Sequence, residues 1–395
     1  MVSQLKAVVP LAGESVRMRP LTLARPKHLL PVASKPIIQR VIETIKSLGI
    51  IDLLVIVGYR KEVIRSFLKD GSQFGVNITY VEQEKPLGLG HAIGLAEPHI
   101  DDTFVAMCGD NLYRADLREI VKKHIERKDT ATLLVEEVQD PWRYGVIKTA
   151  IDGRILELVE KPEQPPSNKV ITGFYVFEPE IFDAIKHTSP SKRGEIEITD
   201  AIHRLAAEGF QVYGEPLLGW RKDVGYPWDL LEANEVYLKD LTSRDIHPKV
   251  NGPARMGDNT IISDKARIVG PVVIGENCKI GSCEIRPHTS IGNNVEISQG
   301  VLVENSLILD GVFLDEGDEI RHSIIGENSR IGKSVRTETT LPTKDFIRFM
   351  VQGKIVNSHR KHVGAIIADD IKIDSNSILK PGEIIPAINK IRAIV

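Results

Sequence analysis

The sequence predicts an α/β domain with a mostly parallel sheet, followed by a parallel β-helix, and three observations support this prediction. In residues 1–240, short apolar runs alternate with segments that have apolar residues at helical spacing, which is typical of βαβ units. In residues 261–395, aliphatic residues recur every six positions, which indicates the short strands of a β-helix. Residues 241–260 contain several prolines and glycines and are predicted to be a linker.

Composition limits the classes of protein to which the chain can belong. It has 395 residues, of which 42% are hydrophobic and 27% charged, enough to bury a large core in two or three domains. The net charge of −3 with interspersed signs argues against nucleic-acid or membrane partners. Three scattered cysteines suit neither a disulfide framework nor a zinc site, and together with the lack of any membrane-spanning apolar run they favour the cytoplasm.

The first domain is expected to contain regular strands and helices in alternation. The predicted strands are 6–10, 53–57, 76–81, 103–108 and 131–138, and the predicted helices are 37–48, 61–68 and 117–127. Parallel sheets bind ligands at the carboxyl ends of their strands, where the turn at 11–17 and Asp110 both fall. The later strands 145–148, 155–160 and 172–177 are expected to extend the sheet in an antiparallel or mixed manner and to form the wall of a sugar pocket.

The second domain is predicted from a six-residue period. Aliphatic residues in register are Ile262, Ile268, Ile274, Ile280, Ile285, Ile291, Ile297, Val303, Leu309, Ile325 and Ile331. Each triangular coil of a β-helix needs three such strands with tight corners. The period breaks over residues 336–362, which we interpret as a protruding loop, and returns at Ile367.

The turn after the first strand has the composition of a phosphate-binding site. Ala12 and Gly13 allow backbone N–H groups to approach an anion closely, while Arg17 and then Lys27 add positive charge. Two cations on one such segment suit a nucleoside triphosphate. An ordinary strand–turn–helix connection with a surface arginine is the alternative.

Two aspartates are candidate magnesium ligands. Asp110 directly follows a buried strand, and Asp223 stands in the sequence W-R-K-D-V-G. Mg²⁺ prefers one or two carboxylates together with phosphate oxygens. Alternatively, Asp110 caps a helix and Asp223 merely precedes a glycine turn.

Two further segments offer polar groups for a sugar phosphate and for a base. Glu160 and Lys161 place a carboxylate beside an ammonium, which suits sugar hydroxyls and a phosphate, although a surface ion pair would look the same. Gln83 is followed by a glycine-rich turn that contains Gly88, and an amide can read the edge of a planar base. A loop without a ligand is the alternative, and His91 is as suited to packing as to binding.

Taken together, these segments resemble the sugar-1-phosphate nucleotidylyltransferases, of the glucose-1-phosphate thymidylyltransferase and UDP-glucose pyrophosphorylase type. The resemblance covers residues 6–235 and includes A-G-E-S-V-R, P-K, Q-E-K-P-L-G-L-G-H-A, G-D-N, Y-G-V-I, V-E-K-P, T-G-F-Y and W-R-K-D-V-G in the family's order. It implies a Rossmann-like catalytic domain and the following roles. Arg17 and Lys27, with Leu11, Ala12 and Gly13, would hold the triphosphate; Gln83 and Gly88 the base; Asp110 and Asp223 the Mg²⁺; and Gly145, Glu160, Lys161 and Gly173 the sugar phosphate.

The resemblance also implies a reaction. A sugar 1-phosphate attacks the α-phosphorus of a nucleoside triphosphate and pyrophosphate leaves, with Arg17, Lys27, Lys161 and Asp110 supporting catalysis. Gln83 favours UTP or dTTP, and glucose 1-phosphate is the expected sugar. Ser15 and Val16 replace the family's glycine and threonine, so one hydroxyl contact is lost, but the retained cations and aspartates favour an active enzyme.

The repeat region resembles the left-handed β-helix of archaeal bifunctional enzymes that also transfer an acetyl group. The histidine base of those enzymes is missing here, where the sequence reads E-G-D-E-I-R-H, and His322 is displaced from its position. We therefore expect the β-helix to assemble a homo-oligomer, such as a trimer. A bifunctional nucleotidyl- and acetyltransferase and a non-catalytic regulatory or assembly subunit are the alternatives.

Overall fold

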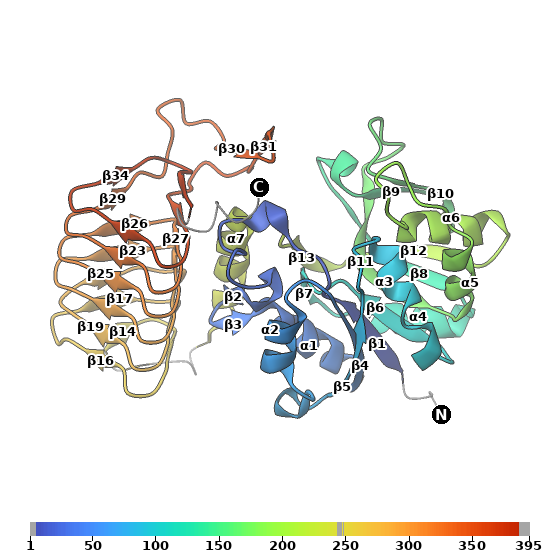
Figure 1. Ribbon diagram of the computed structural model, residues 1–395, viewed down its shortest axis with the longest axis horizontal. Coiled ribbons are helices and arrows are strands. Elements are labelled where there is room, and N and C mark those ends of the chain that lie inside the picture. The colour runs from blue at the N-terminus through green and yellow to red at the C-terminus, as the bar shows by residue number, and fades with distance from the viewer. Residues whose placement is uncertain (1–4, 243–246, 248, 387–395) are drawn as a thin grey trace. The chain divides into compact units, whose positions relative to one another are not determined.

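The chain forms two compact units (Figure 1) in a computed structural model that describes residues 5–242, 247 and 249–386. The first unit contains residues 1–14 and 37–223, and the second contains residues 15–36 and 224–395. This division differs from the predicted boundary at residue 240, because residues 15–36 bond to the second unit. Asn234 accepts a hydrogen bond from the backbone N–H of Ala33, and Arg25 binds Asp369 at 2.7 Å.

Within the described residues, the first unit contains a nine-stranded mixed sheet. Its strands are β1 (Lys6–Pro10), β4 (Asp52–Val57), β5 (Asn77–Glu82), β6 (Phe104–Met107), β8 (Ala131–Glu137), β9 (Gly145–Thr149), β10 (Ile155–Glu160), β11 (Lys169–Phe177) and β12 (Val212–Pro216). Strands β6, β1, β4 and β5 are neighbours in that order and parallel, whereas β11 runs antiparallel to β6, β8 and β9. The predicted parallel sheet with a mixed extension is thus confirmed.

The apolar faces of amphipathic helices pack on this sheet and bury its central strands. The helices of the unit are α1 (Ile37–Ser47), α2 (Lys61–Leu68), α3 (Leu89–Gly94), α4 (Arg118–Arg127), α5 (Glu180–Lys186) and α6 (Ile198–Ala207), with the 3-10 helices η3 (Ser72–Phe74), η4 (Glu97–His99) and η5 (Pro141–Arg143). Val8 of β1 lies in one core with Ile93 of α3, Phe182 of α5 and Ile202 of α6. A two-stranded ribbon, β7 (Asn111–Ala115) with β13 (Gly219–Asp223), completes the unit.

The second unit contains a left-handed parallel β-helix whose coils stack as Figure 1 shows. In its described residues, each of the first six coils contributes one strand to each of three parallel sheets, and the last coil contributes β34 and β35 to the first two. The first sheet is β14 (Val250–Asn251), β17 (Arg267–Val269), β20 (Glu284–Ile285), β23 (Leu302–Glu304), β26 (Glu319–Arg321), β29 (Arg336–Thr337) and β34 (Ile378–Leu379). The second is β15 (Ala254–Met256), β18 (Val272–Ile274), β21 (Thr289–Ile291), β24 (Leu307–Ile308), β27 (Ile324–Ile325), β32 (Ile366–Ile367) and β35 (Ile384–Ile385). The third is β16 (Ile261–Ile262), β19 (Lys279–Ile280), β22 (Glu296–Ile297), β25 (Phe313–Leu314), β28 (Arg330–Ile331) and β33 (Lys372–Ile373).

The hexapeptide period places aliphatic side chains in ladders along the interior of this β-helix. Ile280 pairs with Ile297, and Ile297 pairs with Leu314 one coil further on. All three are at most 3% exposed. The predicted β-helix is confirmed by this register.

The β-helix begins earlier than residue 261, because β14 and β15 lie within residues 241–260. Pro248 of the predicted linker and residues 387–395 lie outside the described residues. The predicted loop at 336–362 starts with β29, which still pairs with β34, and then forms the hairpin of β30 (Arg348–Val351) and β31 (Lys354–Asn357).

The remaining elements of the second unit precede the β-helix in the sequence. They are η1 (Val16–Met18), η2 (Lys27–Leu29), β2 (Pro31–Val32), β3 (Lys35–Pro36) and α7 (Pro227–Leu238). None of the helices in the described part of the chain combines the length and apolar character that a bilayer span requires.

Candidate active site

The predicted phosphate-binding turn follows β1 at the carboxyl end of the sheet. The backbone N–H of Leu11 donates to the carbonyl of Ile56 at 2.7 Å, and the carbonyl of Ala12 accepts from the N–H of Tyr59 at 3.1 Å. These bonds fix the turn against the end of β4. Gly13 is exposed, and a Cβ added there would meet no atom within 4 Å, so the backbone at this point is open to a ligand.

Asp110 lies beside this turn, in the connection between β6 and β7. The N–H of Gly109 donates to the carbonyl of Pro10 at 3.4 Å, which ties the connection to the end of β1. One carboxylate oxygen of Asp110 accepts a hydrogen bond from the Asn111 side chain at 2.9 Å. The carboxylate is thereby oriented at the strand end where ligands of parallel sheets bind.

Strand pairing brings the second predicted metal ligand to the same place. Strand β13 runs antiparallel to β7, and Asp223 pairs with Asn111, the residue that follows Asp110. Directly paired residues in antiparallel strands have Cα atoms roughly 4.5–5.5 Å apart. In residues 5–242, 247 and 249–386, no three His, Cys, Asp or Glu side chains are grouped to hold a metal ion. Two carboxylates fit an ion such as Mg²⁺ that takes its remaining ligands from phosphate groups and water.

A buried arginine that sequence reasoning missed supports this ribbon. The side chain of Arg221 is 5% exposed and forms an ion pair with Glu136 of β8. Its Nε donates to Asn111 Oδ1 at 2.7 Å and to the carbonyl of Thr172 at 2.9 Å. Arg221 therefore joins β13 to β7, β8 and β11. Its proximity to Asp223 in W-R-K-D is the sequence signal that could have identified it.

Two of the predicted sugar-phosphate residues, Gly145 and Glu160, lie where β9 begins and β10 ends. Glu160 pairs with Gly145 across the strands, and the N–H of Lys161 donates to the carbonyl of Tyr144. The Lys161 ammonium lies 2.6 Å from Glu160 Oε1. Gly173 adopts φ +82°, and its carbonyl accepts from the N–H of Cys108, beside Asp110. This hydrogen bond ties Gly173 to the segment that carries Asp110.

Glycine is needed at two of these positions. A Cβ on Gly173 would lie 2.9 Å from Asn111 Nδ2, and its left-handed φ is strained for other residues. A Cβ on Gly145 would lie 2.7 Å from a methyl carbon of Thr199. A larger residue at either position would have to displace these neighbouring side chains.

A second arginine missed by sequence reasoning, Arg193, contacts Glu160. Its Nη1 lies 3.4 Å from Glu160 Oε1, and its Nη2 lies 2.7 Å from Glu195. The carboxylates of Glu160 and Glu195 add negative charge close to Glu197. Burial and the Glu160 charge raise the pKa of Glu197 and of Asp200 above their ordinary values.

The predicted base reader Gln83 is buried at the end of β5, with 6% of its surface exposed. Its amide nitrogen lies 3.1 Å from the carbonyl oxygen of Gly88 and 2.8 Å from Nδ1 of His91. The structure therefore brings Gln83 and Gly88 together and adds His91, to which the sequence assigned no definite role. Gly88 adopts φ +98°, and a Cβ there would lie 2.8 Å from the carbonyl oxygen of Ile196, so the turn requires glycine.

The two predicted triphosphate cations belong to the second unit. Arg17 lies in η1, with its guanidinium 5.2 Å from the centre of the Tyr226 ring. Lys27 is the first residue of η2, after Pro26. Ser15, which replaces the family's glycine, holds a left-handed φ of +57°.

His322, which is displaced from the position of the acetyl-transfer base, lies in the β-helix unit. Its ring stacks on that of His362 with centroids 5.4 Å apart, and its Nδ1 lies 3.3 Å from Asn305 Nδ2. Burial and the neighbouring His362 charge lower the pKa of His322 to about 4.

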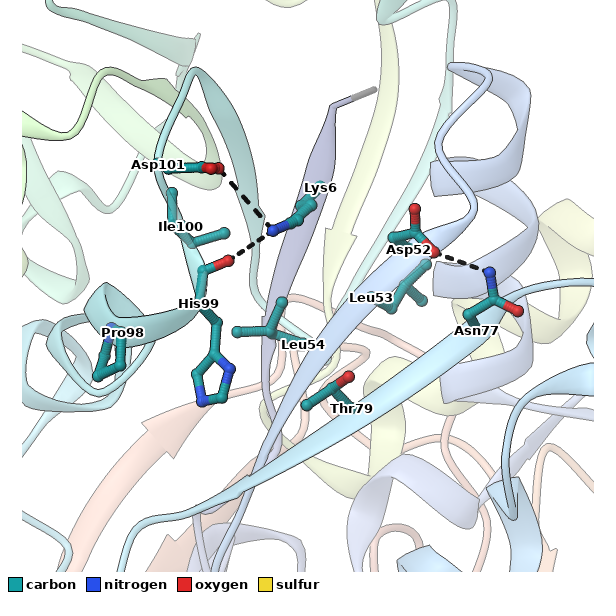
Figure 2. A pocket seen from close by; sticks show the side chains of 10 residues that line it. All are labelled: Lys6, Asp52, Leu53, Leu54, Asn77, Thr79, Pro98, His99, Ile100 and Asp101. Carbon is teal, nitrogen blue, oxygen red and sulfur yellow. Dashed lines mark hydrogen bonds and ion pairs between the residues drawn. The ribbon is translucent and has the colours of Figure 1, made fainter. Parts of the chain in front are cut away.

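A pocket of about 400 Å³ lies at the opposite edge of the sheet from Asp110. Figure 2 shows it at the amino ends of β1, β4 and β5, where Lys6 bonds to the carbonyl of His99 and to Asp101, and Asp52 bonds to Asn77. None of the predicted site residues lines this pocket. This pocket is therefore separate from the predicted site residues.

Comparisons with known proteins identify the family of the chain. Residues 6–240 match the family model described as nucleotidyl transferase, and residues 268–393 match the GMPPB C-terminal domain. A glucose-1-phosphate thymidylyltransferase from Streptomyces antibioticus is 36% identical over 84% of this chain and 94% of its own length. UTP–glucose-1-phosphate uridylyltransferase AglF from Haloferax volcanii is 44% identical over 60% of this chain and 98% of its own.

A solved structure matches part of the chain. A UDP-glucose pyrophosphorylase complexed with UDP-glucose superposes with a TM-score of 0.54 at 29% identity, covering 60% of this chain and 98% of that one.

Proposed function

The chain belongs to the nucleotidyl transferase family, and from this we propose that it joins glucose 1-phosphate to UTP or dTTP and releases pyrophosphate. The pairing of β13 with β7 carries the proposal, because it sets Asp223 opposite the residue after Asp110. Relatives named as a thymidylyltransferase and a uridylyltransferase of glucose 1-phosphate support the choice of substrates.

Enzymes of this family generally use a divalent metal ion, and we propose Mg²⁺ held by Asp110 and Asp223. Both residues offer hard carboxylate oxygens, which Mg²⁺ prefers in company with phosphate oxygens. When bound, the ion would neutralise charge that develops on the reacting phosphates.

The chain's own residues would position the substrates and balance charge. An oxygen of the sugar phosphate attacks the α-phosphorus, a new P–O bond forms, and the bond to the leaving pyrophosphate breaks, so no protein nucleophile is needed. Arg17 and Lys27 would hold the triphosphate, and Lys161 would meet the sugar phosphate.

Measurement of pyrophosphate release tests the proposal. Purified protein with Mg²⁺ should release pyrophosphate with glucose 1-phosphate and UTP or dTTP, in preference to ATP, GTP or CTP. Asp110→Asn should lower kcat by roughly 100-fold or more, since metal and charge stabilisation contribute several kcal/mol, while binding of glucose 1-phosphate changes little.

Asp116→Asn is the matched control. Asp116 follows the same ribbon but is exposed and bonded to Arg118, so this variant should keep wild-type activity. Equal activity of Asp110→Asn and wild type would refute the metal role, and absence of pyrophosphate release with every nucleotide and sugar phosphate would refute the activity.

We also propose that the flat faces of the β-helix assemble the chain into a homo-oligomer, with a trimer as the expected state. Light scattering on the purified protein would distinguish a trimer from other states.

A further inference from the structure

The hydrogen bonds of Gln83 determine which of its side-chain atoms can meet a ligand. A glutamine amide offers two N–H donors on its nitrogen and lone pairs on its oxygen. Here the nitrogen lies 3.1 Å from the Gly88 carbonyl oxygen and 2.8 Å from His91 Nδ1. Both N–H groups are therefore assigned to protein acceptors, and Oε1 is the atom left to face a base.

The Gly88 carbonyl fixes this orientation, because a carbonyl can accept but never donate. It also accepts from the N–H of Ala92 at 3.1 Å in the first turn of α3, which sets its direction. The loop is held in turn by Ile196, whose N–H donates to Leu87 and whose carbonyl accepts from Gly90. A reversed amide would place Oε1 against the Gly88 oxygen and repel it.

His91 then has a defined tautomer and a defined task. Because the amide nitrogen of Gln83 can only donate, His91 Nδ1 is the acceptor in this contact, which places the ring N–H on Nε2. It supplies the second acceptor that holds the amide. His91 stands on α3 only three residues after Gly88, so the glycine turn and the helix bring both acceptors to the same nitrogen.

We propose that His91 is a specificity-determining positioning residue: by holding the Gln83 amide through its nitrogen, it presents Oε1 as an acceptor to the nucleobase. Uracil and thymine carry an N–H at ring position 3 and can donate to Oε1, whereas cytosine has a lone pair there and is repelled. This inference rests on the proposed function, and it concerns which base is accepted rather than whether the reaction occurs.

The test compares kcat/KM for UTP and CTP with glucose 1-phosphate in wild type and variants. His91→Phe keeps an aromatic ring at this position but removes the Nδ1 acceptor. Reversal of the Gln83 amide, which would present its N–H groups to the base, then costs one hydrogen bond, whereas in wild type it costs two. The UTP-to-CTP ratio should fall about tenfold, the equivalent of one hydrogen bond. His91→Gln, which restores an acceptor oxygen, should recover most of the ratio.

His99→Phe is the control, since His99 lies at the opposite edge of the sheet and the ratio should not change. An unchanged ratio in His91→Phe, or equal losses of kcat/KM for both nucleotides, would overturn the inference while leaving the proposed function intact. A wild-type protein that releases no pyrophosphate would instead refute the proposed function.

Discussion

Removal of Arg221 should loosen the ribbon that carries Asp223. In Arg221→Met, the carboxylate of Glu136 loses its ion-pair partner, and the carbonyl of Thr172 and Oδ1 of Asn111 lose a donor. Breaking a fully buried pair costs about 3–5 kcal/mol. Glu136 is 21% exposed and regains some water, so the expected loss is about 2–4 kcal/mol.

Hydrogen exchange of the β7 and β13 amides measures this loss locally, so no assumption about two-state unfolding of the whole chain is needed. The peptides 111–115 and 219–223 should exchange faster in Arg221→Met. The double variant Arg221→Met/Glu136→Met should regain part of the protection. It replaces the ion pair with two apolar side chains, whereas the single variant leaves the Glu136 carboxylate without a partner.

Arg118→Met is the control for this experiment. Arg118 makes an exposed pair with Asp116 next to the same ribbon, and its removal should not change the exchange. If Arg221→Met leaves β7 and β13 as protected as in wild type, or if the double variant is less protected than the single one, the reasoning is wrong.

Two further substitutions test local features of the second unit. Ser15→Gly should raise stability by about 0.5–1 kcal/mol, because glycine adopts the φ of +57° without the side-chain clash; an unchanged or lower thermal midpoint would contradict this. The pKa of His322 is about 4 in the folded chain and 6.5 in the unfolded chain, so the unfolded chain binds the proton more tightly. The free energy of unfolding should therefore rise by up to about 3 kcal/mol from pH 4 to 6.5. His322→Asn should flatten that slope in thermal melts, and an equally steep profile would refute the assignment.

The elements that follow from local periodicity could be predicted from the sequence. A period of six fixes which residues face the interior of a β-helix, so the pairing of Ile280 with Ile297 was accessible without coordinates. The predicted register was wrong at Leu309, because a second five-residue step places Ile308 and then Leu314 in the interior ladders. The position of Asp110 at a strand end could also be predicted from neighbouring residues, because the apolar run that stops at Gly109 defines the end of the strand.

Contacts between distant segments could not be predicted in the same way. Arg221 and Glu136 are 85 residues apart, and their contact depends on the register of β13 on β7, which is set by side-chain packing rather than by propensity. The division of the chain at Ser15 had no compositional signal either, since it depends on single bonds such as that of Ala33 to Asn234.

The geometry around Glu160 explains how Lys161 could act on a phosphate although its ammonium already binds a carboxylate. If Lys161 were the sole partner of Glu160, turning toward a phosphate would leave a carboxylate that is only 19% exposed without compensation. Arg193 contacts the same Glu160 oxygen at 3.4 Å, so positive charge remains when Lys161 turns away. Arg193 thus lowers the free-energy cost of moving the Lys161 ammonium from Glu160 to a phosphate. The Glu160–Lys161 pair, which looks like a surface ion pair in the sequence, can therefore hold the Lys161 ammonium while no phosphate is bound.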